Sequence, residues 1–318
     1  FCPFLIQQAH FYTVDPWAAL FATLAVTSAL RRRWAVAGAM IGFGVACKAS
    51  LVWMGLAMGV AVMILKPRRA WLPIFGRFAI AGLGGLFVGA PWSLVTPIGC
   101  WRGPLIQAQM ASGRFVFPST LQYAKTMPWI YPLGQMTLWG MGLPAVVLGA
   151  LGMARSAVRR QVRTPRAFAL VVAVGFFAAV GALYVKYPRY LLPLYPLWIG
   201  WAGYAIAELG DQGEGRARRW VRIGGAAGAV AVTAVLGLAQ ASVYSGTHPW
   251  TAASRWIYNH VPSGATVAVE SWDHPLPVPL PEGDPLAFNQ VTIPVLDGNP
   301  TGRDLSNEAW EEAVERAR

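Results

Sequence analysis

Apolar residues form long runs along this chain, and charged or Pro/Gly-rich breaks separate one run from the next. Eight such runs predict eight helices that would cross, or partly cross, a membrane. They lie at about residues 16–30, 34–46, 51–65, 78–95, 136–153, 167–184, 191–207 and 223–243. Several are shorter than the roughly 20 residues that a perpendicular span needs, so we expect tilted helices or paired short helices.

The composition agrees with a membrane protein. Of the 318 residues, 55% are hydrophobic and 13% are charged, and the mean hydropathy of +0.44 is above the usual range of soluble domains. The net charge is +12, but the basic residues form short clusters between apolar runs, so no nucleic-acid partner is indicated. We therefore predict an all-α polytopic protein of the cell membrane.

The basic clusters also predict an orientation. They occupy residues 31–33, 66–69, 155–166 and 216–222. If all four face the cytoplasm, the eight segments alternate without conflict. The extracytoplasmic parts are then residues 1–15, a turn at Lys48, the loop 96–135, the turn 184–190 and the chain after 244. Asp15, Lys48, Lys186 and Arg189 are thus predicted to share one face.

The character of the chain changes near residue 244, where acidic residues reappear. We predict a membrane core at residues 1–243 and a small α/β extracytoplasmic region at 244–318, with a helix, a turn at 262–264 and a strand within residues 253–270. The chain starts at Phe1 with no signal-peptide pattern, and residues 307–318 form a helix-like stretch without a cap. We expect that spans precede residue 1 and that the C-terminal region is incomplete.

Asp15 is the only acidic residue among the first 207. Pro16 and an apolar run follow it, so Asp15 fits a helix N-cap. It also fits a carboxylate that acts as a base, a metal ligand or an acceptor-positioning group, and a helix N-terminus would help to keep it ionised. His10 could share a divalent metal with it, although a lone histidine near an interface is more often simply polar.

Three cations lie at predicted span ends. Lys48 interrupts an apolar run, where it either marks a helix end or contacts an anion such as a lipid phosphate. Lys186 and Arg189 lie in the turn "YVKYPRY" with several tyrosines. Basic residues on the extracytoplasmic side go against the positive-inside rule, so their presence needs a cause. One explanation is a phosphate-binding site, and the other is an aromatic belt at the membrane interface.

The loop 96–135 mixes aromatic, amide and basic residues, among them Trp101, Arg102 and Arg114. Sugar sites use such mixtures, since aromatic rings stack on the sugar while amides and cations hold its hydroxyls. An amphipathic helix at the membrane interface would give the same composition. The three cysteines, Cys2, Cys47 and Cys100, have no paired spacing and indicate neither a zinc site nor a disulfide framework.

Three blocks, "HFYTVDPWAALFATLA", "GFGVACKAS" and "VKYPRYLLPLYPLW", resemble in that order blocks of membrane glycosyltransferases of the GT-C class. The family is that of dolichyl-phosphate-mannose protein mannosyltransferases and aminoarabinose transferases, and the resemblance covers about residues 7–205. It implies a GT-C-like helical bundle. It also implies transfer, with inversion, of a mannose-like hexose or aminoarabinose from a polyprenyl-phosphate donor to an acceptor hydroxyl on protein, lipid or glycan.

The resemblance assigns roles to individual residues. Asp15 matches the second extracytoplasmic acid of the family, near the acceptor or a metal, and is our candidate catalytic residue, while Lys48, Arg189 and Tyr190 match positions near the donor phosphate. Lys186, from the same basic turn as Arg189, is a further candidate for binding the donor phosphate. Further candidates for acceptor or sugar binding are His10, Tyr12, Trp101, Arg102 and Arg114. The principal catalytic acid of the family lies in a first extracytoplasmic loop that has no counterpart in this sequence. We therefore expect no transferase activity if the 318 residues are the whole polypeptide.

Two other classes of protein remain open. A non-enzymatic flippase or transporter of lipid-linked sugars usually has charges near the middle of its spans and often inverted repeats. This chain keeps its charges at span ends and shows no repeat, which favours the enzyme. A structural membrane subunit would be expected to have a less polar outer loop than residues 96–135.

Overall fold

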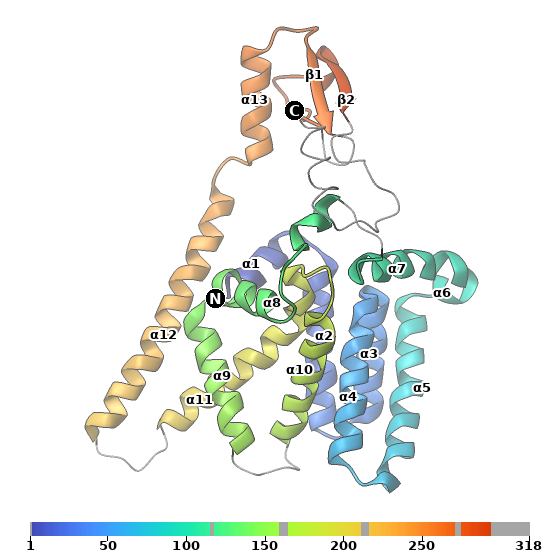
Figure 1. The fold of residues 1–318 in the computed structure, drawn as a ribbon, viewed down its shortest axis with the longest axis vertical. Coiled ribbons are helices and arrows are strands. Elements are labelled where there is room, and N and C mark those ends of the chain that lie inside the picture. Colours follow the sequence, from blue (N-terminus) through green and yellow to red (C-terminus); the bar gives the residue numbers. More distant parts are fainter. Residues whose placement is uncertain (1, 115–117, 159–164, 211–215, 271–274, 294–318) are drawn as a thin grey trace.

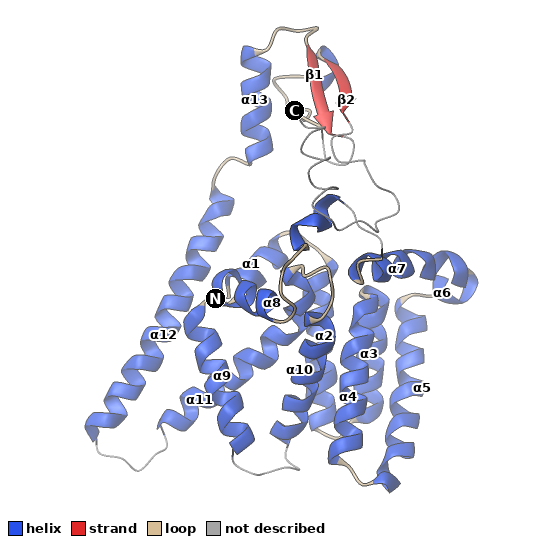
Figure 2. Cartoon of the chain, viewed as in Figure 1, coloured by secondary structure: helices blue, strands red, loops and turns tan. Residues whose placement is uncertain are grey.

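The computed structural model describes residues 2–114, 118–158, 165–210, 216–270 and 275–293. These residues form a mostly helical protein with one small two-stranded sheet (Figures 1 and 2). The α-helices are α1 (Pro3–His10), α2 (Val14–Leu30), α3 (Trp34–Cys47), α4 (Val52–Leu65), α5 (Trp71–Gly89), α6 (Trp92–Val95), α7 (Pro97–Ala111), α8 (Ile130–Gln135), α9 (Leu143–Val158), α10 (Pro165–Gly181), α11 (Tyr195–Gly210), α12 (Arg216–Ser242) and α13 (Pro249–His260). Short 3₁₀ or π turns join several of them, among them η1 (Ala49–Leu51), η3 (Pro118–Tyr123), η4 (Met136–Gly140), η5 (Pro188–Leu194) and η6 (Val243–Ser245).

Each of the eight predicted apolar runs is helical over most of its length, so their helical character is confirmed. The largest error is in the fourth run, predicted at 78–95, because α5 both starts seven residues earlier, at Trp71, and ends six residues earlier, at Gly89. Arg77, which directly precedes the predicted run, lies inside α5. The helix stops at Gly89 because Ala90 precedes Pro91, and a residue before proline disfavours the helical conformation.

Several helices lie outside the predicted runs, among them α1, α7 and α8. α1 precedes Asp15 and carries a proline in its first turn, a position that suits proline. α7 occupies the first part of the loop 96–135, for which an amphipathic interfacial helix was one of the two interpretations. All three cysteines are free, and the Cys2 thiol donates a hydrogen bond to the carbonyl of Gly140 (3.1 Å).

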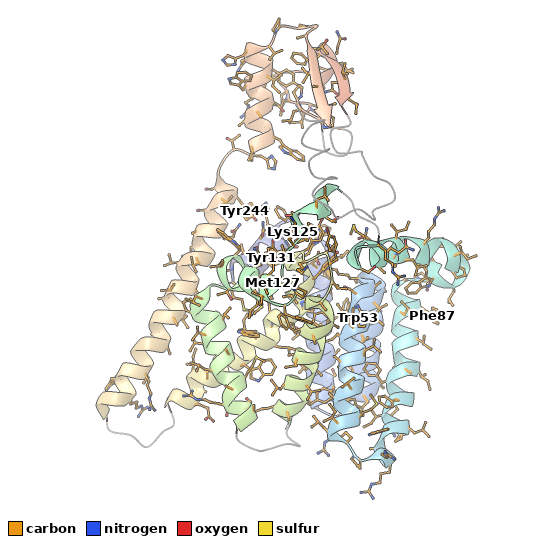
Figure 3. The ribbon with its side chains drawn as sticks, viewed as in Figure 1. Trp53, Phe87, Lys125, Met127, Tyr131 and Tyr244 are labelled. Carbon is orange, nitrogen blue, oxygen red and sulfur yellow. The ribbon has the colours of Figure 1, made fainter. Side chains whose placement is uncertain are left out.

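Small residues line the inner faces of the helices, and large apolar residues cover the outer faces. In α2, Ala18, Ala22 and Ala25 are at most 1% exposed, whereas Trp17 and Leu20 are 51% and 45% exposed. α4 also has large apolar residues on its outer face, but its inner face holds methionines as well as alanines. Trp53 of α4 and Phe87 of α5 are labelled in Figure 3. The inward faces pack closely because small side chains let helix backbones approach one another.

The closest approach of two helices is between α3 and α5. A Cβ atom added to Gly42 would lie 2.0 Å from the carbonyl oxygen of Gly82, and one added to Gly38 would lie 2.0 Å from that of Phe78. Gly38 and Gly42 are four residues apart and form a G-x-x-x-G pattern, which lets two helices pack backbone to backbone. The glycines therefore set the distance between α3 and α5.

Two described helical stretches are long and apolar enough to cross a membrane, Arg68–Gly89 and Arg222–His260. The apolar helices Val14–Leu30, Trp34–Cys47, Ala49–Leu65, Leu143–Ala157 and Pro165–Gly181 are shorter. The second long stretch contains most of α12, which leads away from the helical body to α13 (Figure 1).

The C-terminal elements lie beyond the end of the helical body (Figure 1). Strand β1 (Thr266–Glu270) pairs in parallel with β2 (Asn289–Ile293), with Thr266 opposite Asn289. Arg255 of α13 forms an ion pair with Glu282. The predicted order of helix, turn and strand within 253–270 is confirmed, while the helix-like stretch 307–318 lies outside the described residues.

Candidate functional site

Asp15 lies in the first turn of α2, as its second residue. The N-cap is Thr13, and neither the Thr13 nor the Asp15 side chain accepts a capping hydrogen bond, so the prediction that Asp15 is the N-cap was wrong. Asp15 has helical backbone geometry, and its side chain points away from its own helix. The carboxylate can therefore accept a hydrogen bond from another part of the chain. Only 4% of the Asp15 surface is exposed.

The partner of Asp15 is Lys48, at the C-terminal end of α3. The Lys48 ammonium donates a hydrogen bond to Oδ1 of Asp15, and the two side chains form an ion pair. The Lys48 side chain is 17% exposed and that of Asp15 is 5% exposed. A buried charge without a partner is strongly destabilising, so each residue compensates the other. The sequence predicted that Asp15 and Lys48 lie on the same face of the membrane, and in the structure the two side chains are in direct contact.

Tyr190 and Arg189 of η5 lie on the other side of Lys48. The Lys48 ammonium is 5.0 Å from the ring centroid of Tyr190, a distance typical of a cation–π interaction. The Arg189 guanidinium is 4.7 Å from the Tyr187 ring and exposed to solvent. The structure therefore brings together four of the predicted residues, Asp15, Lys48, Arg189 and Tyr190.

Further tyrosines support this cluster from the loop 96–135. Tyr123 packs edge to face on Tyr187 (5.2 Å between centroids) and on Tyr131 (5.9 Å), and Tyr187 packs in the same way on Tyr190 (5.6 Å). Figure 3 shows Tyr131 at this end of the helical body. Burial raises the pKa of the Tyr123 hydroxyl, so Tyr123 stays a neutral hydrogen-bonding group.

Lys186 is separate from this cluster. It is 5% exposed, and its ammonium donates a hydrogen bond to the carbonyl oxygen of Tyr184 (2.9 Å). Burial lowers the pKa of the Lys186 ammonium. In the described part of the chain, no ion pair or hydrogen bond joins Lys186 to Asp15 or Lys48. A role for Lys186 at a donor phosphate stays a prediction.

His10 and Tyr12 precede Asp15 in sequence but point to other surroundings. The His10 ring stacks on Tyr244 of η6, 3.7 Å between centroids. Tyr12 is 89% exposed and has a positive φ of 49°. Among the described residues, no three His, Cys, Asp or Glu side chains are grouped so that they could hold a metal ion.

The predicted sugar-binding residues divide between the two ends of α7. The carbonyl of Ala111, at its C-terminal end, accepts hydrogen bonds from the backbone N–H groups of Tyr184 (3.0 Å) and Val185 (3.3 Å), which attaches this end to the turn 184–190. Arg114 is exposed just beyond this end. Trp101 and Arg102 lie about 15 Å further along the helix, near its N-terminal end.

Sequence reasoning missed the pairing of Asp15 with Lys48 and the contributions of Tyr123 and Tyr131. The first could have been found, because a lone acid next to an apolar run needs a cation and Lys48 is the nearest one predicted on its face. The second could not, since no periodicity in the loop 96–135 indicates where it folds.

No family model matches this chain, and no curated protein or solved structure gives a significant match to it. The functional argument therefore depends on the residues of the site and on the surface around them.

Proposed function

We propose that this protein is a multi-span membrane glycosyltransferase. It transfers a sugar, a mannose-like hexose or aminoarabinose, from a polyprenyl-phosphate donor to a hydroxyl group of a protein, lipid or glycan at the extracytoplasmic face. The observation that carries the proposal is the gathering of Asp15, Lys48, Arg189 and Tyr190 at one end of the helical body.

The surface of the helical body supports placement in the plasma membrane. Leu72, Ile80 and Val88 of α5 are 83%, 76% and 73% exposed. Exposed apolar area of this extent is unfavourable in water and suits lipid, and small residues between helices are typical of membrane bundles. The basic turn 31–33 joins the other ends of α2 and α3, a helix length away from Asp15 and Lys48. A cytoplasmic position for these arginines places the site outside.

The charges of the site fit the proposed chemistry. The acceptor oxygen forms a bond to the anomeric carbon while the bond from that carbon to the phosphate oxygen breaks. The electron pair of the breaking bond leaves with the lipid phosphate, whose charge Lys48 and Arg189 can stabilise. Asp15 accepts the proton of the acceptor hydroxyl. Attack from the face opposite the phosphate inverts the anomeric configuration.

Transfer of radiolabelled sugar from a polyprenyl-phosphate donor, in membranes that contain the full-length protein, tests the proposal. Loss of Arg189 removes one charge-assisted contact to the phosphate, so Arg189→Ala should lower kcat/KM by about tenfold or more. Asp15→Asn should abolish the transfer. Turnover that is equal in the wild type and in both variants would refute the assignment.

Arg166 offers a matched control at the opposite end of α10. Its guanidinium lies 4.2 Å from the Tyr204 ring, so it has the same kind of contact as Arg189 on Tyr187. Arg166→Ala should therefore leave kcat/KM nearly unchanged. Translocation of lipid-linked sugar without any transfer would instead identify a flippase.

A further inference from the structure

The ion pair between Asp15 and Lys48 occupies both groups that the proposed reaction needs. Asp15 is nearly inaccessible, and its Oδ1 atom accepts a hydrogen bond from the Lys48 ammonium. A carboxylate held in this way is a poor proton acceptor, because protonating it would leave the Lys48 charge without a partner in a buried position. Lys48 in turn is not available to an incoming anion. While the ion pair is formed, neither charged group is available to a substrate.

Arg189 differs from Lys48 in both respects. It is exposed, and no carboxylate is paired with it in the described ranges of the chain. Because Asp15 and Lys48 compensate each other, the Arg189 guanidinium gives these three residues a net charge of +1. An anion that approaches the site therefore meets Arg189 first.

Two packed tyrosine rings lie against the two cations, Tyr190 against Lys48 and Tyr187 against Arg189. Lys48 lies against the Tyr190 ring, and Tyr190 directly follows Arg189 in η5. A lysine side chain has four rotatable carbon–carbon bonds. Its ammonium can turn from Asp15 toward the Arg189 side while it stays near the ring face.

We propose that the Asp15–Lys48 ion pair is a latch that a phosphate group opens: the phosphate takes Lys48 from Asp15 and so releases the carboxylate. The phosphate can belong to a lipid or be free in solution. This inference rests on the proposed function, which it deepens by coupling donor binding to the availability of the base. No proton moves until the phosphate is in place.

The latch predicts that one substitution changes affinity and activity in opposite directions. Asp15→Asn removes the competitor for Lys48, so the phosphate should bind more tightly, by about tenfold if the ion pair is worth an ordinary charged hydrogen bond. The same substitution removes the base. Lys48→Gln should weaken binding by a similar factor.

The experiment measures equilibrium binding of polyprenyl phosphate to the purified full chain in lipid nanodiscs. The proteins are the wild type, Asp15→Asn, Lys48→Gln and the double variant. Uncharged polyprenol of equal length reports the contribution of the lipid tail, and inorganic phosphate in a separate arm distinguishes a free anion from a lipid headgroup. Glu282→Gln, which removes the acid of the exposed Arg255 pair, is the matched control.

We expect tighter binding by Asp15→Asn and binding by the double variant equal to that of Lys48→Gln, because the gain requires Lys48. Unchanged or weaker binding by Asp15→Asn would overturn the latch. An equal gain in the Lys48→Gln background would also overturn it, since the gain would then be general electrostatics. Glu282→Gln should bind like the wild type.

A measurement on the wild-type protein avoids variants that fail to fold. A hydrophobic carbodiimide labels accessible carboxyl groups, and mass spectrometry gives the fraction of Asp15 modified. Polyprenyl phosphate should increase this fraction several-fold, whereas unchanged or reduced labelling contradicts the release of the carboxylate.

The two proposals can fail separately. Tighter binding by Asp15→Asn without any sugar transfer keeps the latch and refutes the transferase. Sugar transfer without that gain keeps the transferase and refutes the latch.

Discussion

The contact between α3 and α5 leads to a quantitative prediction about stability. Gly42 faces three backbone atoms of α5, since an added Cβ would lie 2.0 Å from Gly82 O, 2.7 Å from Leu86 N and 2.9 Å from Gly82 C. Backbone atoms cannot rotate away as a side chain can, so Gly42→Ala forces the two helices apart. Gly84, two residues beyond Gly82 on α5, has no atom within 4 Å of an added Cβ.

The two positions should respond in opposite directions. Overpacking of a tight contact destabilises by about 1–3 kcal/mol. Alanine is favoured over glycine in a helix by about 1 kcal/mol, and Gly84→Ala gains this preference without a clash. Gly42→Ala gains the same helix preference, which cancels in the comparison, so we expect Gly84→Ala to be more stable than Gly42→Ala by the overpacking cost of about 1–3 kcal/mol.

Reversible unfolding in mixed micelles, with increasing sodium dodecyl sulfate and helix content followed by circular dichroism, gives the free energy of unfolding of each variant. Gly84→Ala in α5 serves as the control for the intrinsic effect of replacing a helical glycine by alanine. If Gly42→Ala were as stable as Gly84→Ala, the close approach of α3 and α5 would be incorrect.

Two further predictions concern other parts of the chain. The Tyr195 hydroxyl is buried and finds no hydrogen-bond partner among the described residues. Tyr195→Phe should therefore raise the free energy of unfolding by about 1 kcal/mol. A decrease of similar size in the free energy of unfolding, measured in the same micelle assay, would show that the hydroxyl has a hydrogen-bond partner. In the C-terminal region, the hydrogen bond from Arg255 holds the pKa of the Glu282 carboxyl below its usual value. The pair therefore stabilises the folded state above the ordinary glutamate pKa and stops doing so as the pH falls through the lowered value. Arg255→Gln should shift the ¹³C NMR titration midpoint of Glu282 upward, and an unchanged midpoint would contradict this.

The sequence was sufficient to predict where the helices lie and poor at predicting how side chains pair. Apolar runs are a signal within one segment, so α2, α3 and α4 were located to within a few residues. The G-x-x-x-G pattern of α3 was visible but gave no partner, because the matching surface on α5 is more than thirty residues away in the sequence.

For the candidate site too, the sequence predicted the positions of residues better than the pairing of their side chains. Topology alone placed Asp15, Lys48 and Arg189 at one end of the body, because helix direction alternates along the chain. It could not show that the carboxylate of Asp15 turns away from its own helix toward Lys48, or that Lys186 binds a backbone carbonyl. Those choices depend on side-chain conformations and on the fold of the loop 96–135.

The length of α12 determines how far the C-terminal elements stand from the helical body. Its 27 residues extend over about 40 Å, whereas the hydrocarbon core of a bilayer is about 30 Å thick. In the proposed membrane orientation, the basic start of α12 lies at one membrane surface and its last turns extend beyond the other. α12 leads to α13 and the sheet, which lie beyond the end of the helical body (Figure 1). Under the proposed function, the length of this single helix would therefore set the space in which an acceptor approaches Asp15.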